Sequence, residues 1–463
     1  MRKAKLVEVA LPDFGEPVDE PVLPRQLYEA RLQRLRQRMV DAGFEILVIY
    51  ADREHCANLA WLSGFDPRFE EAVLVLRPQG VPLLLAGIEN VGMGRAAPLP
   101  MEVRLHRPFG LMGQTREGAE PLADVLRSAG VDTGARIGVA GWKYATAADC
   151  IDPLTSLEVP SYLADALREI AGDRASVINA GPLLMDPDSG LRSANEIDQI
   201  ARFEFAACHT SSAIRRAVLG ARPGMREFDV AALFQPIGLP HNCHPMMSSG
   251  PRAAHGLPSP SSRRLERGDP VTAAFGVWGA LNCRAGFLVQ GADELPAAIR
   301  DYVDRLVAPY FESIAEWLAS AHVGVTGGVL DAAARRRLGD PFFGMGLNPG
   351  HLLHIDEWMH SPVSPGSSIK LKSGTAIQID IIPATGSPWF TTNAEDGIAL
   401  LDERGRSELA ERFPAVHQRV TARRAFVSET IGINLHADVC PLSNIPCWLP
   451  PFWLAPQMAM AMR

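Results

Sequence analysis

A short segment in the C-terminal half of the chain is rich in imidazole and carboxylate groups. His351 is followed closely by Asp356 and Glu357, with two more histidines, His354 and His360, around them. Imidazole and carboxylate side chains exchange protons near neutral pH, and carboxylates can hold a cationic group of a substrate. The same residues could form a solvated loop, so the segment leaves substrate binding and simple solvation open.

Two other histidines precede this segment. His255 lies in a loop rich in Pro, Ser and Arg, where a near-neutral imidazole could accept a proton from water as a general base. His244, in the run His241-Asn-Cys-His244, could serve as acid, base or ligand. Each of the two histidines has a plainer interpretation, His255 as a surface residue and His244 as a hydrogen-bonded wall residue.

Cys283 and Arg284 are neighbours in one apolar stretch. A cysteine nucleophile requires a nearby base and a lowered pKa, and most buried cysteines are inert. The guanidinium of Arg284 can hold a carboxylate in bidentate fashion. We therefore expect Arg284 to anchor an anionic group of the substrate, with a salt-bridged structural arginine as the alternative.

The N-terminal part of the chain reads as an α/β domain. Leu32, Leu35 and Met39 fall on one face of a helix over 27–42, which Gly43 would end. Short apolar runs predict strands at 45–50, 72–76, 81–86 and 137–140.

A second domain follows. Ser193 and Glu196 have the spacing of a capping box before a long helix that reaches about Leu219. Later patterns predict a strand from Val271, an amphipathic stretch over 295–320, strand and turn over 369–382, and a helical and then Pro-rich tail. The predicted organisation is an extended lead over 1–25, domains over 26–180 and 190–405, and a tail over 406–463.

The overall composition is that of a globular protein. The 463 residues are 47% hydrophobic and 21% charged, with a formal net charge of −8, and no basic stripe indicates a nucleic-acid partner. No apolar run of about 18 residues predicts a membrane span, and residues 1–24 lack a signal-peptide core. Seven scattered cysteines without a CxxC pair read as reduced thiols. We expect a cytoplasmic protein that binds neither nucleic acid nor membranes.

Several motifs occur in an order that is more specific than any one of them. They are Leu191-Arg-Ser-Ala-Asn-Glu-Ile, Pro223-Gly-Met-Arg-Glu, Arg264-Leu-Glu-Arg-Gly-Asp, Gly350-His351, Ser373-Gly-Thr-Ala-Ile-Gln-Ile-Asp380 and Asn393-Ala-Glu-Asp-Gly. In this order the chain resembles the creatinase, prolidase and Xaa-Pro aminopeptidase family. The resemblance implies an α/β (α+β) protein, in which a creatinase-like N-terminal domain precedes a pita-bread catalytic domain, and a homodimer.

The family's metal site is incomplete here. The resemblance implies two divalent metals held by two Asp, one His and two Glu, yet the two aspartate positions fall near Ala274 and Ala285. No Asp or Glu occurs anywhere over 270–292. The remaining positions are matched by His351, Asp380, where the family usually has Glu, and Glu395. The sequence predicts no cofactor, and the alternative is one divalent ion, Mn, Co or Zn, on these three residues.

Creatinase, in the same family, is a metal-independent hydrolase of a carbon–nitrogen bond. By this resemblance we predict a hydrolase that splits an amide, amidine or ring C–N bond of a small polar molecule. His255 or His351 would be the base, although strict register places Ser259 at the family position and His255 four residues earlier. Asp380 and Glu395 would orient substrate or water, and Arg284, His244, Asp356 and Glu357 would bind substrate. The alternatives are an Xaa-Pro-type aminopeptidase or dipeptidase with one metal, and an inactive binding protein on the same fold.

Overall fold

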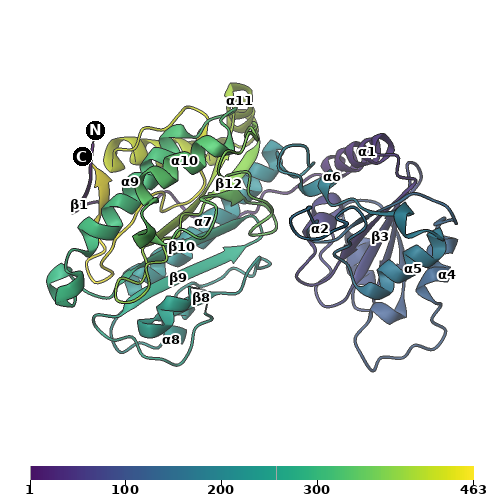
Figure 1. Cartoon of the computed structure of the whole chain (residues 1–463), viewed down its shortest axis with the longest axis horizontal. Helices are drawn as coiled ribbons and strands as arrows, with labels where there is room; N and C mark the ends of the chain where they lie inside the picture. The colour runs from purple at the N-terminus through teal and green to yellow at the C-terminus, as the bar shows by residue number, and fades with distance from the viewer. Residues whose placement is uncertain (1, 257) are drawn as a thin grey trace. The chain divides into compact units, whose positions relative to one another are not determined.

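The computed structural model of the protein describes residues 2–256 and 258–463 and falls into two compact units (Figure 1). Unit 1 comprises Met1–Val22 and Ala194–Arg463, and unit 2 comprises Leu23–Ser193. Each unit has its own sheet and its own hydrophobic core. Within the described residues, none of the helices combines the length and the apolar character that crossing a membrane requires.

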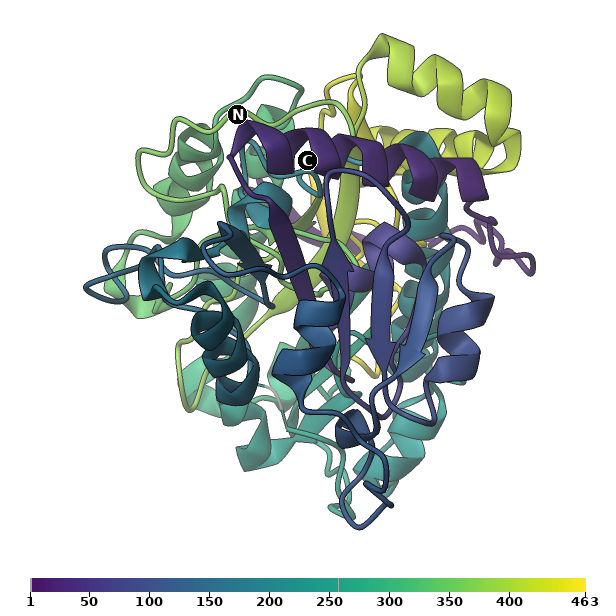
Figure 2. The same cartoon turned by 90° about the vertical axis from the view of Figure 1, so that its right-hand side faces the viewer.

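Unit 2 is built on a six-stranded sheet in the order β5-β4-β3-β2-β6-β7, whose first strands lie side by side in Figure 2. Every residue of β2, β3, β4 and β6 is buried, which explains why these strands appear in the sequence as continuous apolar runs. The strands are β2 (Ile46–Ala51), β3 (Ala72–Leu76), β4 (Leu83–Ala86), β5 (Glu102–Leu105), β6 (Ile137–Ala140) and β7 (Val177–Asn179).

The helices of unit 2 include the predicted first helix. Leu32, Leu35 and Met39 are buried on one face of α1, and Gly43 follows its end with a φ of +72°, a conformation that favours glycine. The helices are α1 (Arg25–Asp41), α2 (Ala57–Ser63), α3 (Val91–Ala96), α4 (Leu122–Ser128), α5 (Ser161–Ala171) and α6 (Pro182–Met185), with 3-10 turns η1 (Arg107–Phe109) and η2 (Arg174–Ser176).

Unit 1 contains an antiparallel sheet in the order β11-β12-β13-β10-β9-β8, with β14 paired to β13. Two of its long strands, β9 and β10, form a hairpin through Trp278 and Gly279. The φ of +96° at Gly279 requires a residue without a side chain. The strands are β8 (Met246–Ser249), β9 (Pro270–Val277), β10 (Ala280–Phe287), β11 (His351–Leu352), β12 (Thr375–Ile379), β13 (Asn393–Leu400) and β14 (Val439–Pro441).

Helices complete unit 1, and the long α7 packs against β9 and β10. The predicted capping box is wrong, because the Ser193 hydroxyl donates to the carbonyl of Gly190 and Glu196 occupies the N-cap position. The helices are α7 (Ile197–Gly220), α8 (Glu227–Ala232), α9 (Ala308–Ser320), α10 (Gly327–Leu338), α11 (Glu403–Arg412) and α12 (Pro414–Ala425). Shorter turns are η3 (Gly250–His255), η4 (Ala292–Glu294), η5 (Ala297–Ile299), η6 (Val303–Val307), η7 (Pro341–Phe343) and η8 (Phe426–Ile431).

Both ends of the chain belong to unit 1. Strand β1 (Ala4–Glu8) pairs antiparallel with β15 (Met458–Met462). The side chains of Trp448, Phe452 and Trp453 are buried in the same core as the main sheet. The lead and the tail that the sequence set apart over 1–25 and 406–463 therefore pack largely with the second domain instead of forming separate segments.

Candidate functional site

One face of the unit 1 sheet carries the residues that face a cavity. Ala274 of β9 lies opposite Cys283 of β10, and Cys283 lies opposite Glu395 of β13. Because side chains alternate between the two faces of a strand, Thr272 and Asn393 point to the same side as these three residues. The hairpin and β13 thus present one continuous row of side chains.

These side chains line a cavity of about 280 Å³, near the lower end of the roughly 300–1,000 Å³ that is usual for small-molecule pockets. Its wall is largely apolar, and its polar groups include Asp380, which follows β12, and Asn393 and Glu395 of β13. The lining residues are Cys243, His244, Met246, Gly256, Thr272, Ala274, Leu281, Cys283, Leu347, Glu357, Trp358, Asp380, Ile382, Thr391, Asn393 and Glu395.

Asp380 and Glu395 form a buried carboxyl pair in this cavity. Burial raises the pKa of Asp380 to about 6, although nearby His351 works in the opposite direction. Burial, reinforced by the charge of Asp380, raises the pKa of Glu395 well above its usual range. Burial therefore disfavours the charged form of both carboxyl groups, and Glu395, which is hydrogen-bonded to Asp380, keeps its proton to a higher pH than an ordinary glutamate does.

Hydrogen bonds from β13 and α9 fix the orientation of Glu395. The amide nitrogen of Asn393 lies 2.6 Å from Glu395 Oε1 and donates to it. The Tyr310 hydroxyl lies 3.3 Å from the side-chain oxygen of Asn393, and it accepts from the backbone N–H of Ala394 at 2.8 Å. Oxygen Oδ1 of Asp380, by contrast, is buried without a hydrogen-bond partner among the described residues. The pair thus has one anchored member and one buried oxygen without a partner among the described residues.

His351 lies behind the wall of the cavity and does not line it. Its imidazole is fully buried and stacks on Trp358 with ring centroids 4.2 Å apart. Its Nε2 lies 3.3 Å from Glu357 Oε1 and 3.8 Å from Asp380 Oδ2. Burial lowers the pKa of His351, but the two carboxylates outweigh burial and raise the pKa above its usual value. His351 thus lies outside the described lining of the cavity, where its imidazole can orient the Asp380 carboxylate, and its role as a base stays a prediction.

The residues present do not fit the family's two-metal site. Ala274 and Ala285 occupy the predicted aspartate positions on the cavity-facing side of the hairpin. Around Ala274 the wall is an apolar cluster of Met246, Leu281 and Cys283, which offers no hard oxygen donor. Among residues 2–256 and 258–463, no group of three or more His, Cys, Asp and Glu is placed to hold a metal ion.

Cys283 lines the cavity but lacks the features of a nucleophile. Its thiol is almost fully buried, and burial together with the charge of Glu395 raises the pKa well above its ordinary value. The neighbouring Cys243 has a pKa raised to about 12, again chiefly by burial. Thiolates, the reactive form, are therefore scarce at this wall.

The other predicted site residues divide into two groups. His244 and Glu357 line the cavity, as their assignment to substrate binding requires. Asp356 is half-buried and lies outside the described lining. His255 also lies outside this lining and is exposed at the end of η3, beside the lining residue Gly256. His255 is thus exposed next to the cavity and outside its described lining, and its role as a base stays a prediction.

Arg284 is also placed differently from the prediction. It is fully buried on the side of β10 opposite to Cys283, and its guanidinium lies 2.8 Å from Asp396 Oδ2. Its remaining donors bond to backbone carbonyls of Trp448, Cys283, Glu395 and Ile445. The prediction that Arg284 anchors an anionic group of the substrate is therefore wrong. Arg284 joins the C-terminal tail to the sheet and does not reach the cavity.

Asn393 and Trp358 are the functional residues that sequence reasoning did not assign. Asn393 holds Glu395, and its position two residues earlier on the same strand is a signal that the alternation of β13 could have supplied. Trp358 stacks on His351 and lines the cavity, a contact across a loop that no periodicity predicts.

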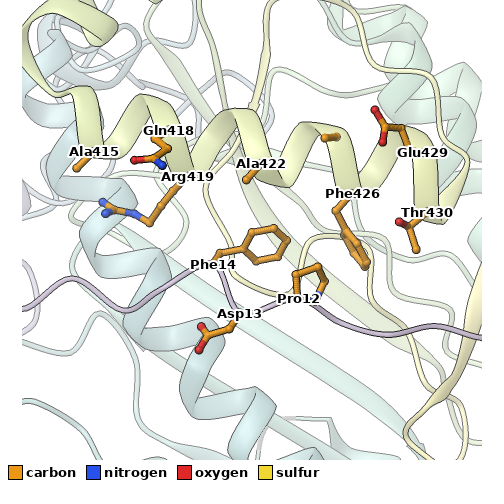
Figure 3. A pocket seen from close by; sticks show the side chains of 11 residues that line it. Pro12, Asp13, Phe14, Ala415, Gln418, Arg419, Ala422, Phe426, Glu429 and Thr430 are labelled. Carbon is orange, nitrogen blue, oxygen red and sulfur yellow. The ribbon is translucent and has the colours of Figure 1, made fainter.

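A second hollow, of about 620 Å³, lies elsewhere in unit 1. Figure 3 shows Pro12, Asp13 and Phe14 on one side of it and residues of α12 and η8 on the other. The guanidinium of Arg419, which lines this hollow, donates a hydrogen bond of 2.6 Å to the carboxylate of the buried Glu204. None of the described residues that line it belongs to a buried carboxyl pair or carries an imidazole, so the cavity at Asp380 is the better candidate for chemistry.

Comparisons with known proteins agree with this architecture. Residues 31–170 match the Creatinase/Prolidase N-terminal domain, and residues 205–400 match Metallopeptidase family M24. Such a pairing defines a class of two-domain hydrolases with a pita-bread catalytic domain. The chain belongs to the creatinase/prolidase family of this class.

Solved structures show the same fold at low sequence identity. A dipeptidase from Mycobacterium ulcerans is 20% identical, with 82% of this chain and 94% of that chain covered and a TM-score of 0.58. A prolidase from Pyrococcus horikoshii is 18% identical, with 80% and 95% covered and a TM-score of 0.60. An X-Pro aminopeptidase from Thermotoga maritima is 19% identical, with 80% and 95% covered and a TM-score of 0.61. No curated protein sequence matches the chain.

Proposed function

We propose that this protein is a metal-independent hydrolase that splits a C–N bond of a small molecule by general-base attack of water. The observation that carries the proposal is the buried pair of Asp380 and Glu395, which lines a cavity whose metal-binding aspartates are replaced by Ala274 and Ala285. A pair of carboxyl groups with separated pKa values is suited to divide the roles of base and acid.

In this proposal Asp380 is the base. Its carboxylate takes a proton from water as the water oxygen bonds to the substrate carbon. Glu395 donates its proton to the nitrogen, which keeps the bonding electron pair when the C–N bond breaks. The proton on Asp380 then passes along the hydrogen bond to Glu395, and the pair returns to its starting state.

The surrounding residues have positioning and binding roles in the same proposal. His351 orients Asp380 Oδ2 from behind, at 3.8 Å. Asn393 holds Glu395 Oε1, so the other oxygen of this carboxyl group is the one available for proton transfer. His244 and Glu357 line the cavity and contact the substrate. In this proposal the protein acts as a homodimer in the cytoplasm, in keeping with the family resemblance.

The match to a metallopeptidase family favours a second candidate, an Xaa-Pro-type peptidase with one metal on His351, Asp380 and Glu395. The direct approach of His351 Nε2 to Glu357 and Asp380, and the apolar cluster at Ala274, favour the metal-free hydrolase. The two candidates differ in their response to chelator.

The test is a thermal-stabilisation screen of amides, amidines and cyclic amides, followed by product analysis of each stabilising compound. We expect at least one to be consumed at an unchanged rate after dialysis against chelator. Asp380→Asn should abolish consumption, whereas Glu429→Gln, an exposed carboxylate at the second hollow, should leave it unchanged. Activity that chelator removes and manganese restores, on X-Pro peptides, would establish the peptidase instead.

A further inference from the structure

The ionisable groups that line the cavity are mostly acidic. Glu357, Asp380 and Glu395 line it together with His244, and none of the described lining residues is Lys or Arg. A carboxylate-bearing ligand would therefore meet three carboxyl groups without a guanidinium or ammonium to hold it. Like charges brought together in a partly desolvated site are costly, so this lining selects against anions.

Arginines near the cavity are held by other groups. Arg284 is fully buried on the opposite side of β10 and pairs with Asp396. Arg252, in the turn that precedes Gly256, contacts Glu227 at 3.2 Å and donates to a backbone carbonyl. Arg263 forms two hydrogen bonds with Asp269, at 2.6 Å and 3.0 Å. Recruiting any of them to an anionic ligand would break an existing ion pair.

Two features of the cavity favour a cation. Asp380 lines the cavity and is only 5% exposed, and its Oδ1 has no hydrogen-bond partner among the described residues. Trp358, whose ring stacks on His351, also lines the cavity next to Glu357, and an indole ring beside carboxylates attracts cations through its π electrons. Met246, Leu281, Leu347 and Ile382 add apolar surface for the rest of the ligand.

We propose that this cavity takes a compact cation, a primary ammonium or amidinium on an apolar body, that carries no carboxylate. The head group would lie between Trp358, Glu357 and the carboxyl group of Asp380, and the apolar body would contact Met246 and Leu281. The inference rests on the proposed function only in calling this ligand a substrate. In that case the hydrolysed C–N bond belongs to an amide that also bears a cationic group.

The test uses three probes of nearly the same shape: benzamidinium, benzamide and benzoate, which differ chiefly in charge. Calorimetry at pH 7.5 on the full chain should show benzamidinium binding at least about tenfold more tightly than benzamide, with benzoate weakest. Glu357→Gln should weaken benzamidinium binding about tenfold and leave benzamide binding within about twofold. The matched control Glu429→Gln makes the same change of charge at the second hollow and should alter neither.

The outcomes separate this inference from the hydrolase proposal. Equal or tighter binding of benzoate, or no binding of benzamidinium at millimolar concentration, overturns the inference even if an amide is hydrolysed. Tight, Glu357-dependent binding of benzamidinium without turnover of any cationic amide supports the inference and counts against the hydrolase. Because the three probes are compared on the unmodified protein, the result stands even if a variant fails to fold.

Discussion

Replacing Asp380 with Asn should stabilise the protein, and by an amount that depends on pH. The pKa of Asp380 is raised to about 6 in the folded protein, mainly by burial. In an unfolded chain the pKa of an aspartate is about 3.9. The folded and unfolded pKa values of Asp380 differ by about two. Each pKa unit corresponds to about 1.4 kcal/mol, so the ionised form of Asp380 costs the folded state roughly 3 kcal/mol.

The sign follows from proton binding. The folded state holds the proton of Asp380 more tightly than the unfolded state does, so the stability that this gives is complete below pH about 4. It is lost as the pH rises through about 6. Asparagine is neutral at every pH and avoids this loss. Asp380→Asn should therefore match the wild type near pH 4 and exceed its free energy of unfolding by up to about 3 kcal/mol at pH 8.

The assay is denaturant unfolding of both proteins between pH 4 and pH 8, in the presence of chelator, with melting temperature as a second readout. A gain of up to about 3 °C in Tm is expected at pH 8 for the 463-residue chain. Asp13→Asn, at an exposed carboxylate, is the control and should change stability by less than about 0.5 kcal/mol at any pH. A difference that does not change with pH, or an Asp380→Asn protein that is less stable at pH 8, would refute the reasoning.

Three further predictions concern the remaining parts of unit 1. Once a substrate is found, Glu395→Gln should lower kcat at least about 100-fold, because Gln cannot donate the proton that the leaving nitrogen requires. Circular dichroism should show an intact fold, and a loss of kcat under about threefold would remove Glu395 as the acid. Cys283 should resist iodoacetamide in the folded protein at pH 8 and react after unfolding, as peptide mass spectrometry would show, because burial raises the pKa of its thiol. Trp453→Ala should cost about 3–5 kcal/mol in denaturant unfolding, because its side chain is fully buried in the core, and an unchanged midpoint would argue against a structural tail.

Much of the fold was predictable because its signals are local. Apolar runs predicted β2, β3 and β6, and the 3.6-residue spacing of buried side chains predicted α1. The order of the motifs led to the pita-bread family, which the family comparisons confirm. The role of the tail was not predictable, since burial of Trp448 and Trp453 depends on contacts with distant parts of the chain.

The site was predictable in composition and less so in geometry. The sequence identified Asp380, Glu395 and Glu357, and the structure brings them to one cavity. The misplacement of Arg284 was avoidable, because neighbours on a strand face opposite sides and Cys283 faces the cavity. The position of His351 behind Trp358 was not predictable, since ring stacking across a loop leaves no pattern in the sequence.

The central claim, a hydrolase site without a metal, is tested most directly by metal content. The protein would be purified without chelator, incubated with manganese, cobalt or zinc, desalted and subjected to elemental analysis. The apolar cluster at Ala274 predicts less than about a tenth of a metal ion per chain. About one ion per chain, lost in His351→Ala, would contradict the claim and support the single-metal peptidase.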